Sequence, residues 1–217
     1  MLKINPVNYY AYSPVKNSPV SFGASKWEGG EEVKIRNKQT GEMVNASFIK
    51  LDKETHWDFM ERLDESGLWD KTEWGGAVMG DFLKKSPPEP SDFYAIMLKL
   101  PRSREVEKLA FLAEVRKDEK TDDLKLCVAQ STPNADYSDS AFKVGMKSLI
   151  EVAKQQGCKA ITTETTSFQE QAFYRNMGFE IVKKFEPAEI PKNPQKGCIY
   201  GITAGLVRLP EAKFSDF

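Results

Sequence analysis

Two carboxylates stand inside segments that otherwise have the pattern of β-strands. Glu114 lies in the apolar run LAFLAEV, and Glu164 lies in the segment CKAITTET before a short amphipathic stretch. A carboxylate that is buried without a partner is costly, and burial raises its pKa toward the range in which it can accept a proton at neutral pH. Each glutamate is therefore a candidate general base. Each also has an ordinary interpretation, as a structural ion-pair partner or a solvent-facing side chain.

The cysteines and the single histidine indicate neither a nucleophilic pair nor a metal site. Cys127 lies in the strand-like run LKLCVAQ, far along the chain from His56. A cysteine nucleophile needs an adjacent base, so a buried strand cysteine is the favoured interpretation. Histidine is a common general base in proteins, but the context Thr55-His56-Trp57 favours a polar helix residue. No spacing of histidine and cysteine matches a metal site, and no metal is expected.

The composition is that of an ordinary globular protein. The 217 residues are 40% hydrophobic and 29% charged, with a net charge of −1 and a pI near 6.0. This balance argues against nucleic acid as the main partner. No apolar run is long enough to span a membrane, and the N-terminus lacks the apolar core of a secretory signal. The three cysteines are few and odd in number, which does not fit a disulfide framework. A reducing, cytoplasmic location is therefore expected.

The chain divides into a tail and one domain of typical size. Residues 1–26 are rich in Asn, Ser, Pro and Tyr without periodicity, which predicts a flexible segment. The tyrosines Tyr9, Tyr10 and Tyr12 leave open a short recognition motif within it. Residues 27–217 alternate between strand and helix patterns and are expected to form a single domain. The expected strands are 33–36, 43–51, 93–100, 108–116, 123–130, 158–165, 179–185 and 198–207, and the expected helices are 53–65 (capped by Asp52), 72–84, 139–156 and 169–176.

The segment 158–182, CKAITTETTSFQEQAFYRNMGFEIV, carries the most specific pattern. It predicts a strand, a short helix that ends in a left-handed glycine, and a second strand. It resembles the C-terminal acetyl-CoA-binding motif of GNAT-type N-acetyltransferases, and the residues that carry the resemblance are Thr165, Phe168, Gln169, Phe173, Tyr174, Gly178 and Phe179. The resemblance implies an α/β GNAT fold. That fold is a mixed, mostly antiparallel sheet, splayed at its centre, with helices on both faces and the cofactor in the splay.

The resemblance also implies where acetyl-CoA, as co-substrate, would bind. The pantetheine arm would lie along the backbone of Cys127, Val128, Ala129 and Gln130. The pyrophosphate would lie at the start of the following helix, where unpaired N–H groups and the helix dipole favour anions. The glycines of the family loop are absent here. Small residues and one cation would take their place, so the expected contacts are Ser138, Asp139, Ser140, Ala141, Phe142 and Lys143, with Phe173 and Arg175 from the next helix. Asp139 has the alternative role of a helix cap.

Tyr174 is the expected leaving-group residue, because the resemblance places its hydroxyl near the coenzyme A sulfur. A phenol near pKa 10 is a weaker acid than a thiol near 8.5, so hydrogen bonding to the thiolate is a more favourable role than full proton transfer. A core tyrosine is the alternative. We expect direct attack of a primary amine, from a small molecule or a peptide, without an acyl-enzyme. A catalytically inactive GNAT-like module, which binds a partner through its tail or aromatic surface, is the alternative function.

The acceptor pocket is expected near the first two helices. That region contains Trp57, Phe59, Trp69 and Trp74. Aromatic rings suit an amino acid, a peptide end or a polyamine stem. Core packing explains the same residues equally well.

Overall fold

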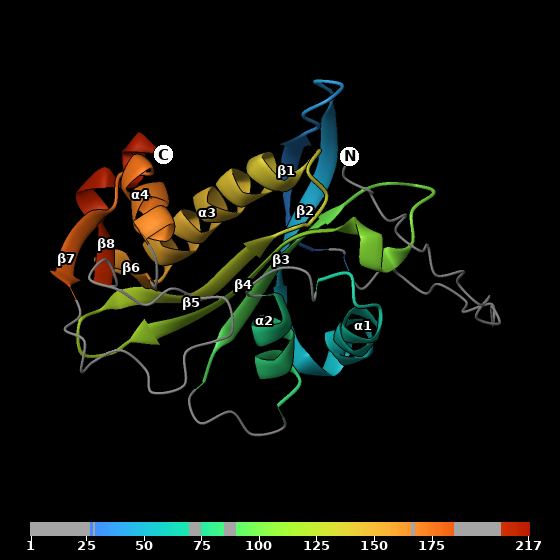
Figure 1. Cartoon of the computed structure of the whole chain (residues 1–217). Coiled ribbons are helices and arrows are strands. Elements are labelled where there is room, and N and C mark those ends of the chain that lie inside the picture. Colours follow the sequence, from blue (N-terminus) through green and yellow to red (C-terminus); the bar gives the residue numbers. More distant parts are fainter. Residues whose placement is uncertain (1–26, 28, 70–74, 85–89, 166–167, 185–204) are drawn as a thin grey trace, which may run out of the picture.

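One mixed sheet forms the centre of the molecule (Figure 1). The computed structural model describes residues 27, 29–69, 75–84, 90–165, 168–184 and 205–217. Eight strands lie in the order β1-β2-β3-β4-β5-β6-β8-β7. Their bounds are β1 Glu31–Arg36, β2 Met43–Leu51, β3 Asp92–Leu98, β4 Leu109–Asp118, β5 Asp123–Ser131, β6 Ala160–Thr165, β7 Glu180–Lys184 and β8 Gly205–Pro210.

The order of helices and strands expected from the sequence is confirmed. Helices α1 (Lys53–Glu65) and α2 (Gly75–Phe82) follow β2, helix α3 (Ser138–Gln155) follows β5, and helix α4 (Phe168–Asn176) follows β6. Short 3-10 helices cover Glu105–Lys108 and Glu211–Asp216. The expected tail at 1–26, Trp74 and the first part of the last expected strand lie outside the described residues.

The helices cover both faces of the sheet, as a GNAT fold requires. Helices α3 and α4 lie on one face, and α1 and α2 lie on the other (Figure 1). Each face has its own hydrophobic core. Phe111, Met146 and Tyr174 belong to the core under α3 and α4, while Phe59, Phe82 and Phe93 belong to the core under α1 and α2. Strands β3 and β4 contribute alternate residues to the two cores, so they are covered on both sides.

One glycine sets how closely α3 approaches the sheet, and another ends α4. Gly145 of α3 faces Phe111, and a Cβ on it would come within 2.6 Å of that ring, so only glycine lets α3 lie against β4. Gly178 follows α4 with φ of +86°, the left-handed conformation that ends the helix and starts β7. The expected cap at Asp52 is confirmed, because its carboxylate accepts from Thr55 N–H at 2.9 Å.

The sheet separates between β5 and β6. These two strands are parallel, whereas every other pair of neighbouring strands among the described residues is antiparallel. They pair only from Asp123 with Ala160 to Leu126 with Thr163, although β5 continues to Ser131. Among the described residues, 128–131 therefore pair with β4 alone. This is the splayed centre that the resemblance to GNAT proteins implied.

Candidate active site

A β-bulge marks the point where β5 leaves β6. On the β4 side, Glu114 pairs with Val128 and Val115 pairs with Leu126, so Cys127 is the extra residue between them. Bulges redirect side chains and interrupt pairing. Past this bulge, no strand of the described residues pairs with the edge of β5 that faces β6. The predicted pantetheine contacts Val128, Ala129 and Gln130 all lie on this open stretch and are partly exposed.

The first turn of α3 offers two free backbone donors. The N–H groups of Tyr137 and Ser138 both bond to the carbonyl of Asn134, and that of Ala141 bonds to the carbonyl of Tyr137. Among the described residues, no acceptor is found for the N–H groups of Asp139 and Ser140. Unpaired N–H groups at a helix start bind anions. The turn can hold a phosphate even though it lacks glycine.

The hairpin between β1 and β2 docks against this helix start. Arg36 N–H donates to Ser140 Oγ at 2.9 Å, and Lys38 N–H donates to the Asp136 carbonyl at 2.7 Å. Lys38 Nζ also pairs with Asp139 at 3.3 Å. A pocket of about 450 Å³ lies between the hairpin and α3, and it is lined by Arg36, Lys38, Asp136, Asp139, Ser140, Lys143 and Val144. The positive charges of Arg36, Lys38 and Lys143 offset the negative charges of Asp136 and Asp139, which on their own would disfavour the expected phosphate.

Asp139 is not the helix cap. The cap position belongs to Tyr137, whose side chain makes no capping bond, and α3 begins at Ser138. Asp139 therefore lies in the first turn, where its charge interacts with the helix dipole and with Lys38. The alternative role expected for Asp139 was wrong because the turn at Asn134 starts the helix before Asp139 is reached.

The other predicted cofactor residues occupy neighbouring turns of α3 and α4. Phe142 contacts both Phe111 and Phe173 edge to face, with ring centroids 5.9 and 5.0 Å apart. Phe173 is 44% exposed, so this aromatic contact joins α3 to α4 at the surface. Lys143 and Arg175 are exposed, and Ala141 is buried in the core. Their roles toward a cofactor stay predictions.

Tyr174 lies beside Thr163, the last residue of β6 that pairs with β5. Its side chain is buried, packs against Phe179 with centroids 5.1 Å apart, and shares a hydrogen bond with the Thr163 side chain. Burial, and then the charge of Glu170, raise the pKa of Tyr174 well above its usual value. Thr163 is the partner of Leu126, directly before the strands separate. The phenol thus stays protonated beside the splay, where it can donate a hydrogen bond but is a poor acid.

Glu114 lies on the opposite face of the sheet and is held through one oxygen. Its Oε1 accepts from Ser91 Oγ at 2.7 Å and from Arg116 Nη2 at 2.9 Å. Arg116 Nε also donates to Ser91 Oγ at 2.8 Å, which closes the three groups into a ring of hydrogen bonds. The Glu114 side chain is 1% exposed. Sequence reasoning missed Ser91 and Arg116, although two-residue spacing in a strand already places Glu114 and Arg116 on one face.

Glu164 is the exposed counterpart of Glu114. Its carboxylate pairs with Lys125 Nζ at 2.8 Å, and its side chain is 51% exposed. The pKa of Lys125 is raised in the folded protein: burial lowers it, but the hydrogen bond and charge of Glu164 outweigh that effect. The Lys125 ammonium is thereby held charged near neutral pH. The two predicted base candidates thus lie in the same sheet, but Glu114 is buried and Glu164 is exposed to solvent.

Cys127 is close enough to these charged groups for their charges to act on its thiol. Burial, and then the charge of the Glu114 carboxylate, raise the pKa of the Cys127 thiol to about 11. A thiol with that pKa is almost fully protonated at neutral pH. His56, the single histidine, lies elsewhere. It is buried in α1, where its Nδ1 accepts from Asp52 N–H at 2.9 Å and its ring faces Trp27.

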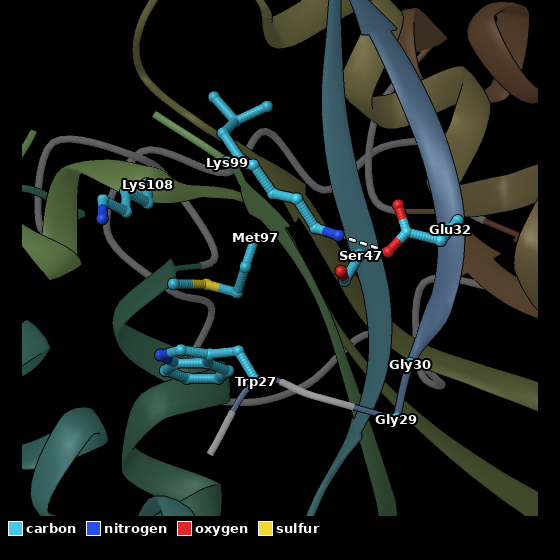
Figure 2. A pocket seen from close by; sticks show the side chains of 9 residues that line it. Trp27, Gly29, Gly30, Glu32, Ser47, Met97, Lys99 and Lys108 are labelled. Atoms are coloured by element: carbon cyan, nitrogen blue, oxygen red, sulfur yellow. Dashed lines mark hydrogen bonds and ion pairs between the residues drawn. The ribbon is translucent and has the colours of Figure 1, made fainter. Parts of the chain in front are cut away.

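The aromatic residues expected near the acceptor are mostly core residues. Phe59 and Trp69 are fully buried, and Trp57 donates from Nε1 to Glu61 at 2.7 Å. A separate pocket of about 340 Å³ lies beyond α1, against β1, β2 and β3. Figure 2 shows the Trp27 ring beside Met97 at one side of this pocket and the Lys99–Glu32 ion pair at the other. None of the predicted site residues lines it.

The described part of the chain contains neither a metal cluster nor a membrane-spanning helix. No group of three or more His, Cys, Asp or Glu side chains there is arranged to hold a metal ion. None of its helices combines the length and apolar character needed to cross a membrane.

Comparison with known proteins places the fold in a family. No protein-family model and no curated protein matches the sequence. Among solved structures, the ribosomal-protein-S18-alanine N-acetyltransferase of Escherichia coli is 12% identical, with a TM-score of 0.52 over 76% of this chain and 93% of that one. A probable GNAT-family acetyltransferase of Chromobacterium violaceum is 11% identical, with a TM-score of 0.50 over 87% and 98%. The chain spans 65% of the length of a nourseothricin acetyltransferase, with 17% identity over 55% of this chain and a TM-score of 0.44. The chain therefore has the fold of the GNAT family of N-acetyltransferases.

Proposed function

We propose that this protein is an acyl-CoA-dependent N-acetyltransferase that moves an acetyl group from acetyl-CoA to a primary amine by direct attack in a ternary complex. The observation that carries the proposal is the separation of β5 from β6 after Leu126 and Thr163. Tyr174 lies at this point on one face of the sheet, and Glu114 lies opposite Val128 on the other face. A thioester in the splay would have a hydrogen-bond donor on one side and a carboxylate on the other.

The cofactor path runs along free backbone groups. The open edge of β5 from Val128 to Gln130 supplies N–H and C=O groups that suit the amides of the pantetheine arm. One of these N–H groups also suits the thioester carbonyl, whose oxygen gains charge during attack. The free N–H groups of Asp139 and Ser140 suit the pyrophosphate, and Lys143 adds a positive charge about one turn further along α3.

The two polar side chains divide the chemistry. An alkyl ammonium must lose a proton before it can attack, which costs roughly 4–5 kcal/mol at pH 7 for a pKa of about 10.4. Glu114 takes that proton, the neutral amine nitrogen bonds to the thioester carbon, and the carbon–sulfur bond then breaks. The nitrogen loses its second proton to solvent, so the products are a neutral amide and the coenzyme A thiolate. Tyr174 donates a hydrogen bond to the departing thiolate. Its raised pKa makes complete transfer of the phenol proton unfavourable, so the thiolate leaves as an anion.

Cys127 supports direct transfer. It lies within the site, at the bulge, but its pKa of about 11 leaves little thiolate at neutral pH. An acyl-enzyme on sulfur would need that thiolate. The amine therefore attacks the thioester itself.

The direct test is binding and then turnover. Isothermal titration calorimetry should detect acetyl-CoA binding. A free-thiol assay with a panel of primary amines, including peptides with a free α-amine, should then detect coenzyme A release that depends on the amine. Absence of binding at millimolar acetyl-CoA would overturn the proposal and favour the inactive binding module. If the full chain captures a partner protein and a variant without residues 1–26 does not, that result would support the alternative function as an inactive binding module.

A further inference from the structure

The pocket beyond α1 is built on one row of residues that crosses three strands. Ser47 of β2 lies opposite Glu32 of β1 on one side and opposite Met97 of β3 on the other. Residues that lie opposite each other in antiparallel strands share a face of the sheet, and Lys99, two residues after Met97, extends the same face. All four residues line the pocket, and none of them belongs to the proposed active site.

An aromatic ring forms one wall of this pocket. The indole Nε1 of Trp27 donates to Glu105 Oε1 at 2.8 Å, and the ring contacts Phe59 edge to face, with centroids 4.7 Å apart. Because its polar atom is already bonded to Glu105, Trp27 offers the pocket an apolar surface. Figure 2 shows this ring beside Met97. With a volume of about 340 Å³, the pocket therefore has an apolar wall and room for a small organic molecule.

Two polar groups that line the pocket have no partner within the described residues. Ser47 is only 4% exposed, yet its hydroxyl makes no hydrogen bond there. Lys108, partly buried at the end of the 3-10 helix before β4, makes neither an ion pair nor a hydrogen bond. A nearly buried hydroxyl without a partner costs free energy, and so does a partly buried charge. Both groups can donate to an acceptor in the pocket.

The charges around the pocket favour an anion as that acceptor. Among the described lining residues, Lys99 and Lys108 are positive and Glu32 is the one carboxylate. Glu32 is paired with Lys99, and the pair is exposed, with side chains 48% and 68% accessible, so its field is neutralised and screened. Lys108 has no such counter-charge. The lining therefore carries one positive charge in excess.

We propose that this pocket binds a small organic monocarboxylate with an apolar body, such as an aryl-substituted acid. The carboxylate accepts a hydrogen bond from the Ser47 hydroxyl and pairs with the Lys108 ammonium, while the apolar body lies against Trp27 and Met97. A neutral amide of the same shape lacks the charge that Lys108 requires. The proposal does not depend on the proposed acetyl transfer, because it needs neither acetyl-CoA nor Glu114.

Calorimetry on the full chain without acetyl-CoA tests what the pocket recognises. Sodium phenylacetate is compared with phenylacetamide, which has nearly the same shape without the charge, and with sodium acetate, which has the charge without the aromatic body, all at equal ionic strength. We expect phenylacetate to bind at least about tenfold more tightly than either comparison compound. Equal affinity for phenylacetate and phenylacetamide, or for phenylacetate and acetate, would overturn the proposal. So would the absence of saturable phenylacetate binding up to about 10 mM.

Substitutions separate a binding role from a structural one. Lys108→Gln should weaken phenylacetate binding by about tenfold, the value of a lost charge-assisted hydrogen bond. Lys34→Gln is the matched control, because it removes an exposed charge of β1 outside the pocket, and it should bind as the wild type does. Ser47→Ala should weaken binding without lowering the melting temperature, since it removes a hydroxyl that has no partner in the free protein. Full binding by Lys108→Gln or Ser47→Ala, or an equal loss in Lys34→Gln, would contradict the proposal.

The place of binding can be read from methionine methyl groups. In NMR spectra of protein with isotope-labelled methionine methyls, phenylacetate should shift the Met97 signal, which Met97→Leu assigns. The signal of Met177 should stay unchanged, because Met177 lines a different pocket, with Lys143 and Lys147 of α3. A shift at Met177 with Met97 unchanged would assign the acid to that second pocket and overturn the proposal.

Discussion

The two ends of the proposed cofactor path are built in opposite ways. Where β5 and β6 separate, the polar groups are buried and held: Tyr174 bonds to Thr163, and Glu114 is fixed by Ser91 and Arg116. At the start of α3 the charges face solvent, and the Lys38–Asp139 pair is 70% and 73% exposed. Buried groups keep their geometry and act at low dielectric, whereas exposed charges are screened by water and salt.

This difference predicts a division of labour. Substitutions at the separating strands should change the rate of the chemical step, because groups there act on the reacting atoms. Substitutions at the start of α3 should change cofactor affinity by smaller factors that depend on salt. The rate of the chemical step and the affinity for the cofactor can be measured separately. The largest expected effect on activity is from substitution of Glu114, and the smallest is from substitution of Cys127.

The largest effect is expected from Glu114. Glu114→Gln keeps the size of the side chain but removes its ability to take a proton, so kcat should fall by about 10²–10⁴-fold, the range for a positioned general base. Glu164→Gln should change kcat little, since Glu164 is exposed and paired with Lys125. Steady-state kinetics with a saturating amine measures both variants. A larger loss for Glu164→Gln than for Glu114→Gln would reverse the assignment of the base.

Tyr174 should give the next largest effect. Tyr174→Phe removes the hydroxyl beside Thr163 and should lower kcat by about 10²-fold, the low end for a positioned proton or hydrogen-bond donor. Acetyl-CoA affinity should change little, because the ring remains packed against Phe179. Calorimetry and kinetics on the same preparation separate the two quantities. A large loss of acetyl-CoA affinity with unchanged kcat would show that Tyr174 only packs in the core and takes no part in the chemical step.

Local patterns in the sequence were sufficient to predict most of the fold. The strand β2 and the end of α1 match their expected bounds at Met43–Leu51 and Glu65. Helix α4 and the turn at Gly178 arise from an amphipathic stretch and a left-handed glycine next to each other in the chain. These features depend on neighbours within a few residues, which is the information that periodicity contains.

The parts of the site that were not predicted depend on register between distant segments. Ser91 and Glu114 are 23 residues apart, and they meet only because β3 and β4 pair with Phe93 opposite Glu114. Arg36 and Ser140 are 104 residues apart and meet through the docked hairpin. The bulge at Cys127 is also a property of pairing. No local pattern in a single sequence specifies such contacts.

The start of α3 should show smaller effects on affinity. Lys143→Ala should weaken acetyl-CoA binding by a factor of about 2–5, as expected for one exposed charge near a helix start, and Asp139→Asn should strengthen it by a similar factor. Both effects should shrink as salt rises toward about 1 M. Calorimetry at two salt concentrations measures them, with Lys147→Ala, one turn further from the helix start, as the matched control. If Lys143→Ala and Lys147→Ala weaken acetyl-CoA binding equally, Lys143 has no specific role in binding the phosphate.

Cys127 should give the smallest effect on activity and a distinct pH dependence. Cys127→Ala should keep kcat within about twofold, because a thiol with a pKa of about 11 supplies little nucleophile at neutral pH. Because burial raises this pKa to about 11, the thiolate at pH 7 is more than about 100-fold scarcer than in an ordinary cysteine. Iodoacetamide labelling of Cys127, measured in a Cys158→Ala/Cys198→Ala background, should be slow at pH 7 and should keep accelerating up to about pH 11. The same labelling in Glu114→Gln should accelerate at lower pH, since the carboxylate that disfavours the thiolate is gone. A labelling midpoint near pH 7, together with an acetyl mass on Cys127 after incubation with acetyl-CoA, would replace direct transfer with a nucleophilic cysteine.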